Sequence, residues 1–217
     1  MNGLRKEAAN TRVGVIVLSA GQSLRFRAAG GLAMTKLVEK LGGRSIVRMA
    51  AEAALASKAR PVIVVTGHAR SAVEAALAGL DVEAAHNPEY SSGIASSLKV
   101  GLSAMPADVA GALVLLGDMP WIEARLIDGM IASFLVNPRA LAAAPTREGR
   151  RGNPVLLGRG LFEAALGLQG DEGARGLIDA LKAGELVEVE APDAGVFADI
   201  DTPGDLAVAR RARSRKL

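Results

Sequence analysis

Hydrophobic residues along this 217-residue chain gather in short, unbroken runs that alternate with longer segments of helical periodicity. A continuous apolar run is typical of a strand buried on both faces, whereas a half-exposed strand alternates apolar and polar residues. Apolar residues that recur every three or four positions predict amphipathic helices. The predicted strands cover residues 13–18, 62–66, 82–86, 112–116, 141–144, 154–157 and 186–190, and the predicted helices cover residues 45–56, 71–78, 92–105 and 122–135.

The alternation of strand and helix predicts an α/β fold with three layers, in which a doubly wound, mostly parallel sheet carries helices on both faces. After residue 140 the alternation loosens and glycine becomes frequent, which predicts a small antiparallel extension. A last helix is expected at Thr202-Pro203, where Thr202 or Asp201 can cap its N-terminus. We expect one domain over residues 1–217, with an N-terminal extension at 1–11 and a basic C-terminal tail at 210–217.

Composition excludes several classes of protein. The chain has no cysteine, so it has no disulfide framework, thiolate metal site or cysteine nucleophile. Six aromatic residues are too few for a protein that stacks single-stranded nucleic acid on its rings. No apolar run approaches the length of a membrane span, and the N-terminus lacks the apolar stretch of a secretory signal. We therefore expect a cytoplasmic protein with no membrane partner.

A loop of small residues follows the first predicted strand, from Ser19 through Ala20 and Gly21 to Arg25. Such a turn lets backbone N–H groups approach phosphate oxygens closely, and Arg25 and Lys36 add fixed positive charge. The loop fits neither the GxxxxGK[ST] pattern of Walker A loops nor the GxGxxG pattern of dinucleotide-binding folds. An ordinary turn with solvated basic residues remains the alternative for this loop taken alone.

Carboxylates occur where the predicted sheet would place a ligand. Asp118 directly follows a buried strand, at the edge where open parallel sheets bind their ligands. Asp199 and Asp201 lie on one face of a later extended segment. Because Mg²⁺ takes one or two protein carboxylates together with phosphate oxygens, Asp118 with Asp199 or Asp201 is a candidate magnesium site. A turn-forming role for Asp118 and a helix cap at Asp201 are the structural alternatives.

Several segments together carry a family resemblance. Residues 15–25, with Lys36-Leu37 downstream, are similar to the LAAGxSxRMG…KLL signature of nucleotidyltransferases with the nucleotide-diphosphosugar transferase fold. Five further segments resemble, in the same order, the molybdenum cofactor cytidylyltransferases, a family with a MobA-like NTP transferase domain. These segments are residues 87–98, 116–120, 151–155, 170–175 and 199–203.

The resemblance implies transfer of CMP from CTP to the terminal phosphate of molybdopterin that carries molybdenum. The products would be the molybdopterin cytosine dinucleotide and pyrophosphate, and the cofactor would be Mg²⁺. A molybdoenzyme or a cofactor carrier is the expected protein partner. The family pattern also brings Arg25 and Lys36 closer together than the ten residues that separate them here, so a longer loop is expected at residues 27–34.

The resemblance also implies a role for each matching residue. It assigns Arg25, Lys36 and Asp118 to catalysis, Asp118, Asp199 and Asp201 to the metal, and Asn153, Asp171 and Arg175 to the second substrate. The nucleotide-binding residues that it implies are Leu18, Ser19, Ala20, Gly21, Asn87, Gly93 and Ser97.

Three alternatives stay open. One is a related transfer reaction, either guanylyl transfer to the same cofactor or nucleotidyl transfer to a sugar phosphate. Another is a non-catalytic, cofactor-binding chaperone, and a third is nucleic-acid binding by the basic tail. The tail holds five of the 26 basic residues and no acid, so the net charge of +3 arises there, and the other 21 basic residues face 23 acidic ones. We therefore expect no nucleic-acid partner.

Overall fold

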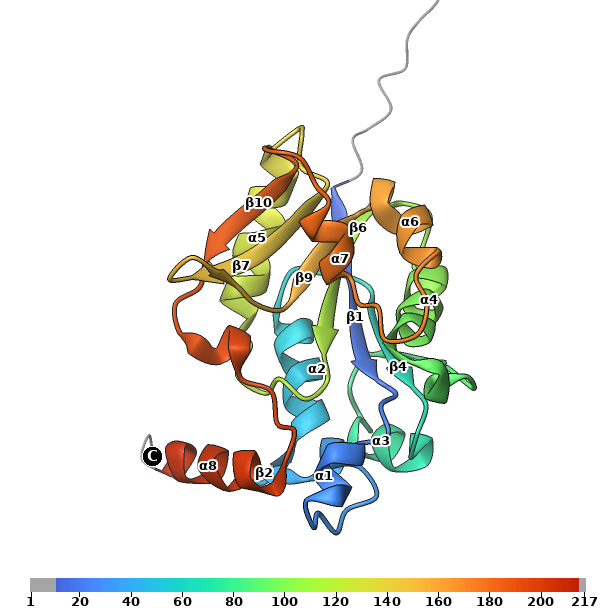
Figure 1. Ribbon diagram of the computed structural model, residues 1–217, viewed down its shortest axis with the longest axis vertical. Coiled ribbons are helices and arrows are strands. Elements are labelled where there is room, and N and C mark those ends of the chain that lie inside the picture. The colour runs from blue at the N-terminus through green and yellow to red at the C-terminus, as the bar shows by residue number, and fades with distance from the viewer. Residues whose placement is uncertain (1–10, 215–217) are drawn as a thin grey trace, which may run out of the picture.

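Within residues 11–214, which the computed structural model describes, a mixed sheet of eight strands forms the middle layer (Figure 1). The strands follow the order β10-β7-β9-β6-β1-β4-β5, and β8 pairs with β7. They are β1 (Arg12–Ser19), β4 (Val62–Thr66), β5 (Glu83–His86), β6 (Val109–Leu116), β7 (Ala142–Arg147), β8 (Arg150–Arg151), β9 (Val155–Gly158) and β10 (Leu186–Glu190).

The direction of the strands places the loops that follow several of them at one edge of the sheet. β5, β4, β1 and β6 are mutually parallel, so their carboxyl ends lie at the same edge. β9 runs antiparallel between β6 and β7, whereas β10 is parallel to β7. The mostly parallel, doubly wound sheet and the antiparallel extension after residue 140 are therefore confirmed. The extension continues the main sheet past β6.

Helices cover both faces of the sheet. On one face α2, α3 and α5 share a hydrophobic cluster with the strands, and on the other α4, α6 and α7 do so. No helix in residues 11–214 is long and apolar enough to cross a membrane. The helices are α1 (Leu24–Ala28), α2 (Ile46–Ala56), α3 (Arg70–Ala76), α4 (Ile94–Ala104), α5 (Ala124–Val136), α6 (Phe162–Leu166), α7 (Arg175–Asp179) and α8 (Pro203–Ser214), with 3₁₀ turns η1 (Lys36–Val38), η2 (Tyr90–Ser92), η3 (Arg159–Leu161) and η4 (Ala194–Phe197).

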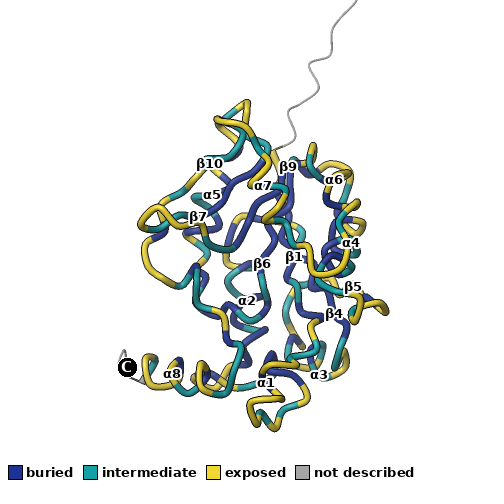
Figure 2. The backbone as a smooth tube through the Cα atoms, in the orientation of Figure 1, coloured by how far each residue is buried: buried dark blue, intermediate teal, exposed yellow. Residues whose placement is uncertain are grey.

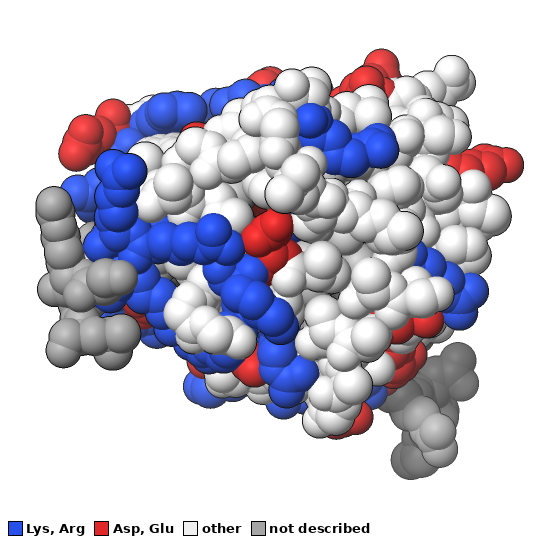
Figure 3. Space-filling view, turned by 90° about the horizontal axis from the view of Figure 1, so that it is seen from below, with Lys and Arg blue, Asp and Glu red and all other residues white. Residues whose placement is uncertain are grey.

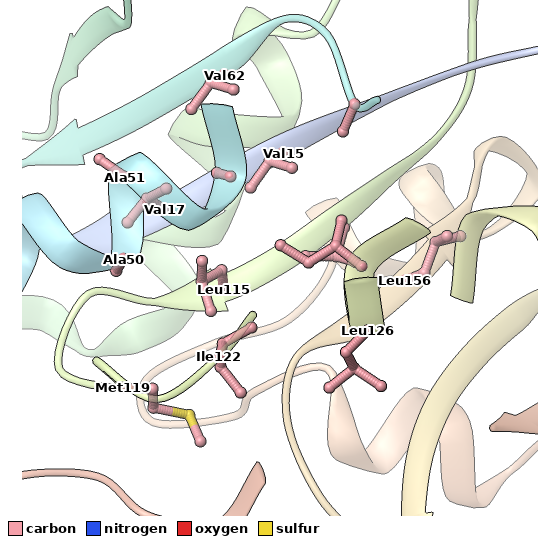
Figure 4. Close-up of a cluster of buried hydrophobic side chains, with 14 of the residues drawn as sticks. Val15, Val17, Ala50, Ala51, Val62, Leu115, Met119, Ile122, Leu126 and Leu156 are labelled. Carbon is pink, nitrogen blue, oxygen red and sulfur yellow. The ribbon is translucent and has the colours of Figure 1, made fainter. Parts of the chain in front are cut away.

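The central strand β1 explains the unbroken apolar runs. Val15 and Val17 point to the face covered by α2 and α5, where they lie near Leu115 of β6 (Figure 4). Ile16 points to the opposite face and belongs to the cluster that includes α4. Burial of such a side chain contributes roughly 1.5–3 kcal/mol, so both faces of the strand favour apolar residues. Figure 2 shows the resulting buried centre beneath an exposed rim of loops.

A small second sheet was absent from the sequence-based prediction. It consists of β2 (Lys40–Leu41) and β3 (Arg44–Ser45), which pair in antiparallel fashion. Gly42 and Gly43 connect them with φ values of 61° and 82°. A two-residue turn with two positive φ angles is the preferred hairpin connection, and the Gly-Gly pair was its signal in the sequence.

The last helix, α8, begins with a reciprocal cap. The backbone N–H of Asp205 donates to Thr202 Oγ1 at 3.1 Å, and the N–H of Thr202 donates to the Asp205 carboxylate at 2.8 Å. This arrangement is a capping box, so Thr202 is the cap and the side chain of Asp201 faces elsewhere. Leu206 and Ala209 attach the helix to a separate apolar cluster near β2. The expected N-terminal extension lies almost wholly outside the described residues, as do the last three residues of the expected tail.

Replacement of the cap residue tests this description of α8. We expect Thr202→Ala to lower the free energy of unfolding by about 1 kcal/mol, because the N–H of Asp205 loses its acceptor. The measurement is denaturant unfolding of the full chain. Ser103→Ala, at an exposed position in α4, is the control and is expected to change stability by less than about 0.5 kcal/mol. Equal stability of Thr202→Ala and the unmodified chain would contradict the capping assignment.

Candidate active site

The candidate site lies at the edge of the sheet where the parallel strands end. Loops after β1 and β6 leave this edge, and the segment before α8 crosses it, since Ile200 N–H donates to the Asp118 carbonyl at 3.1 Å. Figure 3 shows this end of the molecule from below, with acidic side chains in a hollow beside a band of Lys and Arg. Segments far apart in the sequence therefore meet where an open α/β sheet binds its ligand.

Two adjoining clefts open at this edge. The smaller has a volume of about 540 Å³ and is lined by residues 20–26, Lys36 and the start of α4. The larger, of about 830 Å³, lies between β8, α7 and η4. Both volumes are in the usual range for small-molecule sites. The residues that line both clefts are Leu18, Ile94, Leu116 and Asp199. Two ligands bound side by side would therefore meet near Asp199.

The loop after β1 returns to the site through hydroxyl contacts. Ser23, at φ 53°, accepts a hydrogen bond from the backbone N–H of Lys36 at 3.1 Å, and its hydroxyl lies 3.1 Å from that of Thr35. These contacts fix the C-terminal end of the long loop that the sequence predicted at residues 27–34. Exposed Leu32 and Met34 lie in the intervening segment, and Lys36 is brought back into the cleft.

Lys36 joins the two acidic segments. Its Nζ lies 2.7 Å from Asp118 Oδ2 and 2.6 Å from Asp201 Oδ1, and its side chain is 11% exposed. Burial by itself would lower the pKa of Lys36, but the charges and hydrogen bonds of Asp118 and Asp201 outweigh it and raise the pKa above its usual value. Arg25 pairs with the other oxygen of Asp201 at 2.5 Å. Three of the predicted site residues thus form one connected charge network with Arg25 at its rim.

The remaining carboxylate, Asp199, lies close to the same network. Partial burial, followed by the negative charges of Asp201 and Asp118, raises the pKa of Asp199 above its usual range. Asp118 Oδ1 is buried and has no hydrogen-bond partner among residues 11–214. Crowded carboxylates and a free buried oxygen are chemically suited to a hard cation such as Mg²⁺ or Mn²⁺.

These carboxylates do not form a complete metal cage. Across residues 11–214, no three His, Cys, Asp or Glu side chains are arranged to hold a metal ion by themselves. Mg²⁺ commonly uses only one or two protein carboxylates and completes its coordination with water and substrate phosphates. The donor set therefore fits a metal that binds together with a phosphorylated substrate, and the assignment of Asp118, Asp199 and Asp201 stays a prediction.

The residues predicted to bind the nucleotide divide into two groups. Leu18, Ala20, Gly21, Gly93 and Ser97 line the smaller cleft, whereas the side chains of Ser19 and Asn87 lie behind its wall. The Asn87 amide donates to the hydroxyls of Ser96 and Ser97 at 2.8 and 2.9 Å, and its oxygen accepts from the N–H of Glu89. Asn87 thus supports the start of α4, and direct contact of its side chain with a nucleotide stays a prediction.

The segment 170–175, predicted for the second substrate, lies across both clefts. The Gly170 carbonyl accepts a hydrogen bond from Ala95 N–H at 3.0 Å, which attaches the segment to the start of α4. Asp171 lines the smaller cleft, while Arg175 lines the larger one together with Asn153. The segment therefore lies beside both clefts, and Asp171 lines the one that also holds most of the predicted nucleotide-binding residues.

Some cleft residues escaped the sequence-based prediction. Tyr90 lines the smaller cleft, and Arg150 and Phe197 line the larger one beside Arg151, which belongs to the resembling segment 151–155. The two arginines belong to the short strand β8, and Phe197 ends η4. The adjacent arginines were visible in the sequence. The contact of Arg150 with Phe197, almost fifty positions later, had no local signal in the sequence.

A doubly wound sheet with a small-residue loop, basic groups and carboxylates at its carboxyl edge is the arrangement expected of the predicted nucleotidyltransferase. The chain belongs to the family of MobA-like NTP transferase domains, whose model matches residues 15–186. It is 28% identical to the purine catabolism protein PucB of Bacillus subtilis, over 92% of this chain and 96% of that protein. It is also 30% identical over 134 residues to the bifunctional protein GlmU of Micrococcus luteus, of which the match covers 26%.

Solved structures share the fold over almost the whole chain. The Mycobacterium sp. strain JC1 homologue of Rv0371c superposes with a TM-score of 0.80 at 25% identity, covering 95% of this chain and 99% of that one. Rv0371c of Mycobacterium tuberculosis in complex with manganese gives 0.77 at 21% identity, covering 93% and 99%. Molybdopterin-guanine dinucleotide biosynthesis protein A of Archaeoglobus fulgidus gives 0.66 at 17% identity, covering 93% and 99%.

Gly93 tests the attachment of segment 170–175. Its φ is 108°, and a Cβ placed there would clash with the Gly170 carbonyl oxygen. We expect Gly93→Ala to displace this segment and to weaken nucleoside triphosphate binding at least about tenfold, measured by isothermal titration. Gly79→Ala is the matched control, because Gly79 also has a positive φ, of 79°, but open space around it. Equal nucleotide affinity in the two variants would contradict the role given to Gly93.

Asp118 tests the chemistry of the charge network. We expect Asp118→Asn to lower nucleotidyl transfer by more than about a hundredfold, because the site loses a negative charge that can hold a cation. The fold should persist, since the change preserves side-chain volume and Lys36 keeps its contact with Asp201. The measurements are turnover and denaturant unfolding. Asp108→Asn, which removes a surface ion pair with Arg12, is the control and should retain full activity. An active or unfolded Asp118→Asn variant would contradict this account.

Proposed function

We propose that this chain transfers CMP from CTP to the terminal phosphate of molybdenum-loaded molybdopterin, with Mg²⁺ as cofactor. The observation that carries the proposal is the pair of adjoining clefts that share a wall at Asp199. A transferase with two bulky phosphorylated substrates needs two pockets whose phosphate ends meet. Segments that resemble the cytidylyltransferases line both clefts, and the likeness to PucB extends over nearly the full length of both proteins.

In the proposed arrangement, CTP occupies the smaller cleft. Backbone N–H groups at Ala20 and Gly21, together with Arg25 and Lys36, face its triphosphate, and Gly93 and Ser97 face the cytosine and ribose. The buried hydroxyl of Ser97 already accepts a hydrogen bond from Asn87, which fixes its position. Basic side chains at one end of the smaller cleft suit the triphosphate of CTP, and small residues at the other end leave room for its base.

The acceptor occupies the larger cleft, where Asn153 and Arg175 face it. An oxygen of its terminal phosphate attacks the α-phosphorus of CTP, a new P–O bond forms, and the bond to the β-phosphate oxygen breaks with its electron pair leaving on pyrophosphate. The attacking phosphate is already anionic, so no general base is needed. Catalysis then consists of alignment and of charge stabilisation by Arg25 and Lys36.

Asp118, with Asp199 or Asp201, would hold the magnesium ion in this proposal. The ion would supply Lewis-acid stabilisation of the phosphate oxygens. Lys36 contacts Asp118 and Asp201 at present and has the reach to donate to a phosphate oxygen at the same place. The proposed setting is the cytoplasm, where CTP is available, and the proposed recipient of the product is a molybdoenzyme or a cofactor carrier.

The decisive experiment incubates the purified chain and Mg²⁺ with the molybdenum-loaded cofactor and each of the four ribonucleoside triphosphates in turn. Mass spectrometry identifies the dinucleotide, and a coupled assay follows pyrophosphate. With CTP as the nucleotide, we expect a cytosine dinucleotide and one molecule of pyrophosphate for each dinucleotide formed. A guanine product would replace the proposal with guanylyl transfer. Transfer only to a sugar phosphate would identify a sugar-phosphate nucleotidyltransferase, and cofactor binding without turnover would identify a chaperone.

A further inference from the structure

An arginine stacked on a phenylalanine forms part of the wall of the larger cleft. The guanidinium carbon of Arg150 lies 4.4 Å from the centroid of the Phe197 ring. Both side chains line the cleft, and neither belongs to the segments that carry the family resemblance. A guanidinium held on an aromatic face keeps its other face and its N–H edge available to a ligand.

The backbone on both sides of this pair is fixed by close packing. Gly152 lies against η4, and a Cβ at Gly152 would come within 2.6 Å of the Val196 carbonyl oxygen. Asn153 N–H donates to the same oxygen at 3.0 Å. These contacts join the segment after β8 to η4 directly beside the stacked pair.

The charge of Arg150 differs from that of its neighbour. Arg151 forms ion pairs with Asp179 at 2.7 Å and Glu188 at 3.2 Å, which neutralise it. Arg150 is exposed and has no acidic partner within the described part of the chain. A cation that faces the cleft, is not itself paired with a carboxylate and is supported on an aromatic ring is suited to a flat, electron-rich or anionic ligand.

A second arginine–phenylalanine pair provides an internal comparison. Arg159 lies over Phe162, at 5.0 Å from its centroid, but Phe162 is buried and Arg159 donates to the Pro106 carbonyl at 2.9 Å. Neither residue lines the two clefts. That pair attaches η3 to the body of the protein, whereas the pair of Arg150 and Phe197 faces the site.

We propose that Arg150, held on Phe197, is the surface on which the planar heterocycle of the acceptor stacks. This inference rests on the proposed function, which supplies an acceptor that combines a flat nitrogen heterocycle with a phosphate. The two ends of the larger cleft then have separate tasks. The end at Asp199 receives the acceptor phosphate, and the end at β8 and η4 selects acceptors by their ring.

Binding of a pterin tests the inference without turnover. The probe is 6-hydroxymethylpterin monophosphate, followed by quenching of its own fluorescence, and CTP affinity is measured in parallel by isothermal titration. We expect Arg150→Met, Arg150→Lys and Phe197→Leu each to weaken pterin binding about tenfold, because all three remove the stacked plane. CTP affinity should stay within about twofold. Arg159→Met is the matched control and should leave both affinities unchanged.

Two results would overturn the inference. Pterin affinity within twofold of the unmodified chain in Arg150→Met and Phe197→Leu would show that the pair does not contact the ring. Unmodified affinity in Arg150→Lys would show that charge alone is used and that no stacking occurs. Failure of the proposed function has a different signature, namely absence of CMP transfer by the unmodified chain, so the two failures are distinguishable.

Discussion

Contact of one buried ammonium group with two carboxylates holds the functional edge together. Lys36 reaches Asp118, which follows the central strand β6, and Asp201, which lies 165 residues further along the chain than Lys36. Without a cation between them, the carboxylates of Asp118, Asp199 and Asp201 would repel one another in a partly buried site. The chain thus brings three distant segments together by charge at a place where its hydrophobic core ends.

Around this contact, different parts of the fold build the two clefts. Strands β1 and β6 are buried on both faces and give the edge a rigid base. The loop after β1 supplies the positive charge of the smaller cleft, and the antiparallel extension builds the larger one. Segment 170–175 contacts both sides and is attached to α4 through Gly170. The two clefts are therefore built largely from different segments of the chain.

Most strands and the longer helices could be predicted because their signals are local, whereas the short helices α1, α6 and α7 and the short strand β8 were not predicted. The predicted strands include all seven of the main path through the sheet. Continuous apolar runs mark the central strands, as the burial of Val15, Ile16 and Val17 on two covered faces explains, whereas the edge strands β5 and β10 contain exposed glutamates. The hairpin of β2 and β3 was missed because two-residue strands have no periodicity. The capping residue was left open between Asp201 and Thr202. The reciprocal hydrogen bonds of Thr202 and Asp205 identify Thr202 as the cap, and the Asp201 side chain contacts Lys36 instead.

The candidate site was predictable to the extent that motif residues line a cleft directly. Gly21, Lys36 and Asp118 line the smaller cleft, as their positions after buried strands or in the resemblance indicated. Asn87 shows the limit of such reasoning, because its amide is used to fix Ser96 and Ser97. Arg150 and Phe197 show the opposite limit, since their contact depends on how the hairpin packs against η4 and not on any spacing in the sequence.

The central claim is that a nucleotide and a divalent metal meet at the Lys36 network. A crystal structure with Mn²⁺ and a non-hydrolysable CTP analogue, in which anomalous scattering locates the metal, tests it most directly. We expect Mn²⁺ on Asp118 and on Asp199 or Asp201, with the triphosphate beside Lys36 and the larger cleft left open for the acceptor. Metal bound away from these carboxylates, or nucleotide bound between Arg150 and Arg175, would contradict it.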